Sequence, residues 1–164
     1  MTSAHYAAAD AAQMRALARD VLAPHLRAGD VVILSGELGA GKTTFTQGLG
    51  DALGVRGPVA SPTFIIARTH PSIVGGPALI HVDAYRLTSL AELDDLDLDT
   101  TVDDSVTVVE WGADKAEQLS DDRIHVDISR ERGGDVDMER PDEGLRTVTF
   151  TTFGDRWDGV ALVG

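Results

Sequence analysis

The sequence predicts an α/β domain that contains a mostly parallel sheet with antiparallel strands at its edge. Residues 31–34 are all apolar, which is typical of a central parallel strand covered by helices on both faces. A glycine-rich loop follows, and residues 42–53 then have the character of a helix that ends at Gly54. Later in the chain, apolar and polar residues alternate over 124–128 and, more loosely, over 145–150, so we expect a late antiparallel hairpin.

The remaining elements follow from periodicity and from turn residues. Apolar residues at helical spacing in an alanine-rich background predict an amphipathic helix over 8–26, stopped near Pro24. Ser89 and Glu92 form a capping box, which predicts a short helix over 89–98. Further strands are expected at 61–67, 78–83 and 105–109, with a glycine- and proline-rich turn at 71–77.

The composition favours one soluble domain. A chain of 164 residues can bury a core around a single sheet, so we expect one domain over 1–164 with its core at about 8–150. No apolar run approaches the roughly 20 residues of a membrane helix, and the first residues do not resemble a secretory signal, so no membrane association and a cytoplasmic location are expected. The absence of cysteine excludes disulfides, thiolate metal sites and cysteine nucleophiles.

The charge balance bears on nucleic-acid binding. The net charge is −13, whereas a protein that binds RNA or DNA unaided normally presents a basic face to the phosphates. Any contact with nucleic acid is therefore expected to be indirect. The acidic surface has two interpretations, simple solubility and a docking surface for a basic partner.

The glycine-rich loop carries the clearest chemistry. Gly36, Gly41, Lys42 and Thr43 match the fixed positions of the Walker A signature, between a buried strand and a helix as that motif requires. Glycines let successive backbone N–H groups turn inward at a helix N-terminus, Lys42 adds a charge toward the β and γ phosphates, and the Thr43 hydroxyl can bind magnesium. The predicted fold is therefore a three-layer domain like that of P-loop NTPases. The residues expected to hold the nucleotide are Gly39, Ala40, Gly41, Lys42, Thr43 and Thr44.

A bound magnesium ion needs a further acidic group, normally at the end of a neighbouring strand. Asp83 and Glu110 both end predicted strands, and the carboxyl ends of parallel strands lie at the sheet edge that holds the loop. Each residue also has a plain alternative, because a carboxylate at a strand end can be a solvated loop residue.

Three segments after the loop resemble motifs of one protein family. Residues 61–64 read Ser-Pro-Thr-Phe, residues 81–87 read His-Val-Asp-Ala-Tyr-Arg-Leu, and residues 110–112 read Glu-Trp-Gly. Their order and spacing after the loop over 36–44 are similar to those of the TsaE (YjeE) proteins of bacterial tRNA threonylcarbamoyladenosine synthesis. The resemblance spans roughly residues 8–150, and four linked motifs are more specific than the loop alone.

The resemblance implies roles for individual residues. Glu110 and Thr43 would bind magnesium together, and Asp83 would organise the attacking water, so that Asp83 and Lys42 are the expected catalytic residues. Ser61 and Thr63 would belong to a switch-like loop, in which Thr63 contacts the γ phosphate or the metal; its alternative is an ordinary strand start.

Four further residues keep two interpretations each. Trp111 is expected either near the nucleotide or in the core, and Arg146 either at the nucleotide or exposed on an edge strand. Tyr85 and Arg86 could support the site or face a partner. His81 is expected to be a packed or orienting residue, because the five histidines show no metal-ligand spacing.

The function implied by the resemblance is an ATP-binding and hydrolysing subunit required for threonylcarbamoyladenosine modification of tRNA at adenosine 37. ATP and Mg²⁺ are the expected cofactors, and the TsaB and TsaD proteins are the expected partners, which would contact the tRNA themselves. Hydrolysis by the chain alone is expected to be slow, since no arginine finger beyond Arg86 is evident. The alternatives are a small-molecule P-loop kinase and a nucleotide-sensing module that does not hydrolyse.

Overall fold

A seven-stranded sheet organises the part of the chain that the computed structural model describes, which is residues 2–36, 41–55, 67–83, 105–110, 122–130, 146–160 and 162. The strand order is β1-β7-β6-β2-β5-β4-β3. The strands are β1 (Thr2–Ala8), β2 (Val31–Gly36), β3 (Ala67–His70), β4 (Ala78–Asp83), β5 (Ser105–Glu110), β6 (Arg123–Arg130) and β7 (Arg146–Phe153). The helical elements are α1 (Ala11–Leu17), η1 (Ala18–Leu22), η2 (Ala23–His25), α2 (Lys42–Leu53) and η7 (Asp155–Trp157).

The centre of the sheet is parallel, as predicted. Strand β2 pairs in parallel with β5 and β6, and β4 pairs in parallel with β5. Val31 and Ile33 point to one face of β2, Val32 and Leu34 to the other, and all four are fully buried. A strand buried on both faces has no polar side to turn toward water, which explains its uninterrupted apolar run.

Antiparallel strands flank this centre. The predicted late hairpin is present as β6 and β7, in which Val126 lies opposite Phe150, and β3 runs antiparallel to β4 at the other edge. Strand β1 was not expected: it pairs antiparallel with β7, and Tyr6 lies opposite Val148. Its sequence, TSAHYAA, has three alanines and no valine or isoleucine, so local propensity does not distinguish it from the helix that follows.

The predicted helix over 8–26 is shorter and less regular than expected. Ala8 belongs to β1, and α1 begins after Asp10, whose carboxylate accepts a hydrogen bond of 2.8 Å from the backbone N–H of Gln13. The helix then widens into the π-helical turn η1 and ends in the 3₁₀ turn η2, which contains Pro24. The expected stop near Pro24 is therefore confirmed, and the expected start is wrong.

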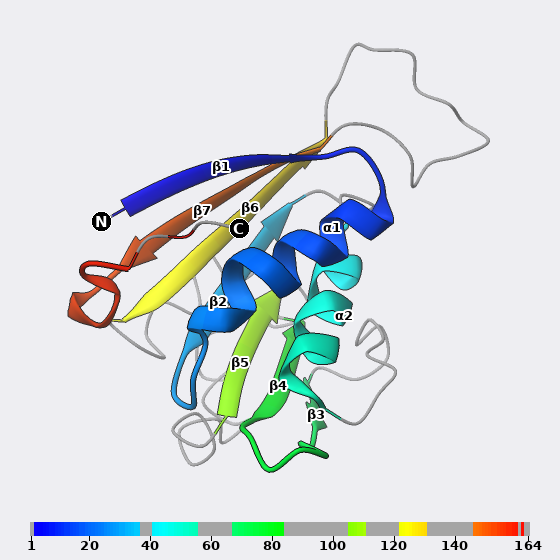
Figure 1. Ribbon diagram of the computed structural model, residues 1–164, viewed down its shortest axis with the longest axis vertical. Helices are drawn as coiled ribbons and strands as arrows, with labels where there is room; N and C mark the ends of the chain where they lie inside the picture. Colours follow the sequence, from blue (N-terminus) through cyan, green and yellow to red (C-terminus); the bar gives the residue numbers. More distant parts are fainter. Residues whose placement is uncertain are drawn as a thin grey trace.

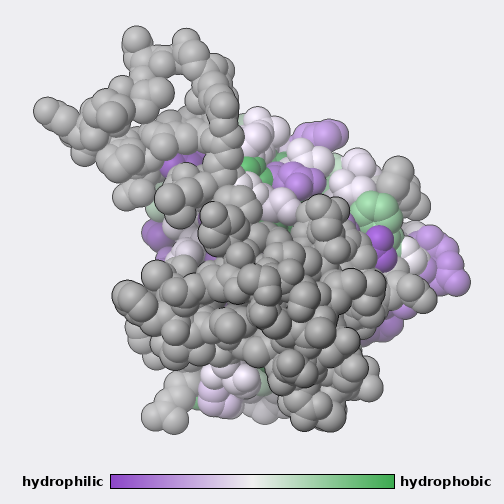
Figure 2. Space-filling view, turned by 180° about the vertical axis from the view of Figure 1, so that it is seen from behind, coloured by the Kyte–Doolittle hydropathy of each residue, from purple (hydrophilic) through white to green (hydrophobic). Residues whose placement is uncertain are grey.

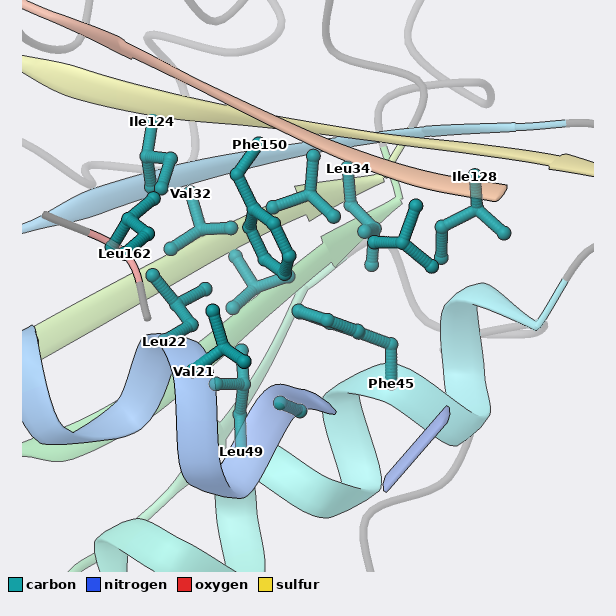
Figure 3. Packing of buried hydrophobic residues seen from close by; sticks show 14 of the residues in the cluster. Val21, Leu22, Val32, Leu34, Phe45, Leu49, Ile124, Ile128, Phe150 and Leu162 are labelled. Carbon is teal, nitrogen blue, oxygen red and sulfur yellow. The ribbon is translucent and has the colours of Figure 1, made fainter. Parts of the chain in front are cut away.

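Helices α1 and α2 lie side by side on one face of the sheet (Figure 1). The core fills the space between this pair and the sheet, where the rings of Phe45 and Phe150 are 5.9 Å apart and Leu22 and Leu49 point inward (Figure 3). A Cβ atom on Gly48 would lie 2.6 Å from the carbonyl oxygen of Arg15, so only glycine lets α2 approach the backbone of α1 this closely.

The other expected elements divide into those observed and those outside the described residues. The turn over 71–77 and the strands over 78–83 and 105–109 are confirmed, the last extended by one residue to Glu110. Of the strand expected at 61–67, only Ala67 is described, as the first residue of β3, and the helix expected at 89–98 lies outside the described residues.

Few large hydrophobic side chains are exposed among the described residues. In the view from behind, the visible described residues are mostly hydrophilic or neutral (Figure 2). Among the described residues, the large hydrophobic side chains exposed to solvent are Ile73 and Val74, in the turn between β3 and β4. No helix in the described part of the chain has both the length and the apolar character needed to cross a membrane.

Candidate nucleotide-binding site

The expected site residues meet at the carboxyl ends of the parallel strands. In the register of the sheet, Glu110 of β5 lies beside both Leu34 of β2 and Asp83 of β4. Strand β2 leads through the loop to Gly41 and the start of α2. The backbone positions of Asp83 and Glu110 therefore lie at the same sheet edge as the loop, as predicted.

Helix α2 begins with an open N-terminus. Its N-cap, Gly41, has φ +113° and ψ +18°, a conformation that residues with a Cβ rarely adopt, and as a glycine it has no side chain with which to cap the helix. The first helical hydrogen bond, 2.9 Å long, runs from the Phe45 N–H to the Gly41 carbonyl. The N–H groups of the first turn of α2 therefore have no acceptor within the helix itself, and they lie at the positive end of a 12-residue helix, an arrangement that suits a phosphate group.

Lys42 is held against the end of β2. Its side chain is buried, and Nζ donates a 2.7 Å hydrogen bond to the carbonyl oxygen of Gly36. The Lys42 carbonyl in turn accepts a 2.9 Å hydrogen bond from the hydroxyl of buried Thr46, while Thr43 and Thr44 are half-buried. The ammonium group is thus held beside the loop and within the reach of a phosphate bound at the helix N-terminus.

The Arg146 side chain of β7 lies close to Gly41, the last residue of the loop before α2. A Cβ on Gly41 would lie 3.8 Å from Cδ of Arg146 and 3.2 Å from Cε of Met14. Arg146 is buried on β7, which lies between β1 and β6, so the alternative of an exposed arginine on an edge strand is wrong. The position of Met14 against the loop was not predicted, because nothing in its helical spacing indicates which face of the sheet α1 covers.

Glu110 is buried next to a histidine. Its Oε1 atom lies 3.3 Å from Nε2 of His81, and both side chains are at most 5% exposed. Glu110 is therefore not a solvated loop residue, and His81 is packed, as expected. Neither atom makes an aligned hydrogen bond, so this oxygen of the carboxylate is buried without the donor that would normally offset the loss of water.

This carboxylate suits a magnesium site completed by a nucleotide. Among the described residues, no group of three or more histidine, aspartate or glutamate side chains could hold a metal ion alone. Magnesium in nucleotide sites is commonly held by one or two protein oxygens together with phosphate oxygens and water, and the Thr43 hydroxyl and the buried Glu110 carboxylate are donors of this kind. The burial of Glu110 with Oε1 lacking an aligned donor is the observation that favours a cation near this carboxylate.

Several predicted residues lie outside the described part of the chain. These are Gly39, Ala40, Ser61, Thr63, Tyr85, Arg86 and Trp111. Asp83 is described through its backbone, which places it beside Glu110. The roles of these residues remain predictions.

A family model for the threonylcarbamoyl adenosine biosynthesis protein TsaE matches residues 8–138. The chain belongs to the TsaE family. It is 58% identical over 145 residues to the tRNA threonylcarbamoyladenosine biosynthesis protein TsaE of Streptomyces coelicolor, with 88% of this chain and 93% of that protein covered. Identity to the TsaE protein of Bacillus subtilis is 37% over 147 residues, with 89% and 84% covered.

A solved structure agrees with this family assignment. The crystal structure of Bacillus subtilis YdiB superposes on the chain with a TM-score of 0.70 at 31% identity, and the match covers 96% of this chain and 90% of that one. The predicted α/β fold of the P-loop NTPase type is thereby confirmed. TsaE membership and this fold together indicate a nucleotide-binding protein of the tRNA threonylcarbamoyladenosine biosynthesis family.

Proposed function

We propose that this protein binds and hydrolyses ATP with Mg²⁺ as a subunit required for threonylcarbamoyladenosine modification of tRNA at adenosine 37. The observation that carries the proposal is the open N-terminus of α2, with Lys42 Nζ held 2.7 Å from the Gly36 carbonyl and the buried carboxylate of Glu110 at the adjacent strand end. A helix terminus, a fixed cation and a buried acid at one sheet edge meet the main requirements for a magnesium–nucleotide complex.

Each residue then has a defined task. The first N–H groups of α2 and the loop residues Gly39 and Ala40 would bind the phosphates, and Lys42 would exchange the Gly36 carbonyl for phosphate oxygens. Thr43 and Glu110 would hold magnesium, which supplies positive charge to offset that of the phosphates.

The remaining predicted residues would complete this site. Asp83 would orient the attacking water, and Arg146, which already lies against the loop, would face the nucleotide. Trp111 would lie near the nucleotide, and Ser61 and Thr63 would respond to the γ phosphate.

The substrate RNA would be held by partner proteins. With a net charge of −13, this chain would repel the phosphate backbone of a tRNA, so we expect the TsaB–TsaD complex to bind the tRNA and this protein to act on that complex. Such a role is consistent with a cytoplasmic location. Hydrolysis by the chain alone should be slow, because the sequence shows no evident arginine finger beyond Arg86 and such a finger is typically worth about 10³- to 10⁵-fold in rate.

The decisive experiment measures phosphate release by the purified protein with Mg²⁺–ATP, alone and with TsaB and TsaD. We expect a slow basal rate that rises when both partners are present. The same rate with and without the partners would contradict the proposal. Transfer of labelled phosphate from ATP to a metabolite would indicate a kinase instead, and tight binding without any phosphate release would indicate a nucleotide-sensing module.

A further inference from the structure

His81 and Glu110 face one another across two parallel strands. In the register of the sheet, His81 of β4 lies beside Val108 of β5, and Glu110 follows Val108 by two residues. The side chains of His81 and Glu110 therefore project from the same face of the sheet at successive positions. Nε2 of His81 is 3.3 Å from Oε1 of Glu110. The same face carries Leu79 and Val106 one step earlier, and both are part of the apolar core.

A histidine in this position is unusual for packing alone. Its ring is completely buried, and neither Nδ1 nor Nε2 makes a hydrogen bond. Its described polar contact is with the carboxylate of Glu110. Because an apolar side chain would fill this part of the core without burying two ring nitrogens, the contact with Glu110 is the property that distinguishes histidine here.

We propose that His81 is a positioning residue that orients the Glu110 carboxylate for magnesium. At 3.3 Å, Nε2 of His81 and Oε1 of Glu110 are close but not aligned, so the tautomer that carries its hydrogen on Nε2 would donate to Oε1 after a small rotation of the carboxylate. This hydrogen bond would fix the carboxylate and leave its second oxygen for the metal. This inference rests on the proposed function, because it assumes that Glu110 is a magnesium ligand. Partners of metal ligands commonly change metal affinity by about 10- to 100-fold when they are removed.

Two substitutions of His81 can distinguish a role in orienting the Glu110 carboxylate from a role in filling space in the core. The amide nitrogen of glutamine can occupy about the place of His81 Nε2, whereas that of asparagine corresponds to Nδ1 and falls short of Glu110. The measurement is the Mg²⁺ concentration that gives half-maximal binding of a fluorescent ATP analogue. We expect His81→Asn to raise this concentration about tenfold or more, and His81→Gln to change it less than about threefold.

A matched control lies on β5. Thr107 is also fully buried with a hydroxyl that makes no hydrogen bond, but it points to the opposite face from Val108 and Glu110. Thr107→Val should leave the half-maximal Mg²⁺ concentration unchanged. A shift as large as that of His81→Asn would show a general response to core substitutions and would overturn the positioning role.

The same measurements distinguish a failure of the positioning role of His81 from a failure of the proposed function. If the wild-type protein binds the ATP analogue only with Mg²⁺ and folded His81→Asn requires no more Mg²⁺ than wild type, the positioning role is wrong while the proposed function stands. If the wild-type protein binds no ATP analogue at any Mg²⁺ concentration, the proposed function fails, and the inference with it.

A measurement on the wild-type protein does not depend on whether the variants fold. Nitrogen-15 NMR of the His81 ring identifies which nitrogen carries the hydrogen. We expect the hydrogen on Nε2. A ring with its hydrogen on Nδ1 alone could not donate to Oε1 and would overturn the inference.

Discussion

Strand β2 is buried on both faces along residues 31–34, whereas β7 alternates between buried residues and residues that are exposed or half-buried. On β7, Val148 and Phe150 face the helices, and Thr147 is exposed on the other side. The centre, defined as β2, β5 and β4, has two buried faces, and the wing, defined as β1, β7 and β6, has one. The candidate site lies at the end of the centre, and the wing contributes Arg146, the first residue of β7.

This contrast shows how the fold divides its tasks. Burial on both faces fixes the position and register of the central strands, so their carboxyl ends can hold charged groups at set distances. One face of the wing packs against the core beneath the helices, and its opposite face is polar and partly exposed. Substitutions should therefore affect function at the end of the centre, and stability on the inner face of the wing.

The largest expected effect is on stability within the wing. Phe150→Ala removes a fully buried ring that packs against Phe45 and Tyr6, and should lower the free energy of unfolding by about 3–5 kcal/mol. Thr147→Ala on the exposed face of the same strand should change it by less than about 0.5 kcal/mol. Urea denaturation measures both, and equal effects would mean that the two faces of the wing do not differ as described.

The next effect concerns the end of the centre. Lys42→Ala should weaken ATP binding by about 100-fold, because a charge-assisted hydrogen bond to phosphate is lost. Isothermal titration calorimetry would measure the affinity, with Thr147→Ala as the control. ATP binding of wild-type strength by Lys42→Ala would remove Lys42 from the site.

The helix pair that covers the inner face provides a third test. Gly48→Ala would force a Cβ to within 2.6 Å of the Arg15 carbonyl, and should lower the free energy of unfolding by about 1–3 kcal/mol. Gly76→Ala is the matched control, since the nearest atom to its Cβ would be Ser72 Oγ at 3.9 Å. If Gly48→Ala left the thermal midpoint unchanged, the close approach of α1 and α2 would be wrong.

A smaller effect is expected from the acid at the end of β5. Glu110→Gln keeps the shape of the side chain and removes its charge, so the Mg²⁺ concentration needed for half-maximal ATP binding should rise at least about tenfold, and no less than in His81→Asn. Binding measured with the metal chelated should not weaken. An unchanged Mg²⁺ titration would exclude Glu110 as a metal ligand.

The smallest effect is a pH dependence of stability that arises at Asp30, where a residue that precedes the centre contacts one that follows the wing. Asp30, before β2, accepts hydrogen bonds of 3.2 and 3.1 Å from Nε and Nη2 of Arg156, which follows β7, and one of 2.8 Å from the Arg27 N–H. Burial nevertheless raises the pKa of Asp30 above its ordinary value of 3.8, outweighing these contacts. The folded state therefore binds this proton more tightly than the unfolded state.

The sign of the pH effect follows from that shift. The stabilisation due to protonated Asp30 is fully present below the unfolded-state pKa and is lost as the pH rises through the higher folded-state pKa. Carboxyl NMR should give a titration midpoint for Asp30 above 3.8. In Asp30→Asn, this part of the pH dependence of the unfolding free energy should disappear. A midpoint below 3.8 would mean that the ion pair outweighs burial.

The sequence predicts the centre better than the wing. The run over 31–34, the loop and α2 are specified by residues close together in the chain, and two-sided burial leaves an uninterrupted apolar signal. Strand β1 has a weak local pattern and is stabilised by β7, which is distant in the sequence. Tertiary pairing therefore decides a segment whose composition equally suits a helix.

The site shows the same division. The placement of Lys42, Thr43 and the strand-end acids at one edge of the sheet could be predicted from motif and spacing, and their roles stay predictions. The contact between His81 and Glu110 depends on the register of β4 against β5, and the approach of Arg146 and Met14 to Gly41 depends on how α1 and β7 pack. Neither the register nor the packing can be read from one sequence, because both are set by residues far apart in the chain.

The pairing of β1 with β7 also constrains the order of assembly. Thr2 lies opposite Thr152, so β1 leaves the ribosome well before β7, the strand with which it pairs. Until then, β1 is an unpaired strand on a nascent chain, and its polar, alanine-rich composition makes it a poor template for association with other chains. The same composition that makes β1 difficult to predict as a strand therefore also disfavours its association with other chains while it is unpaired during synthesis.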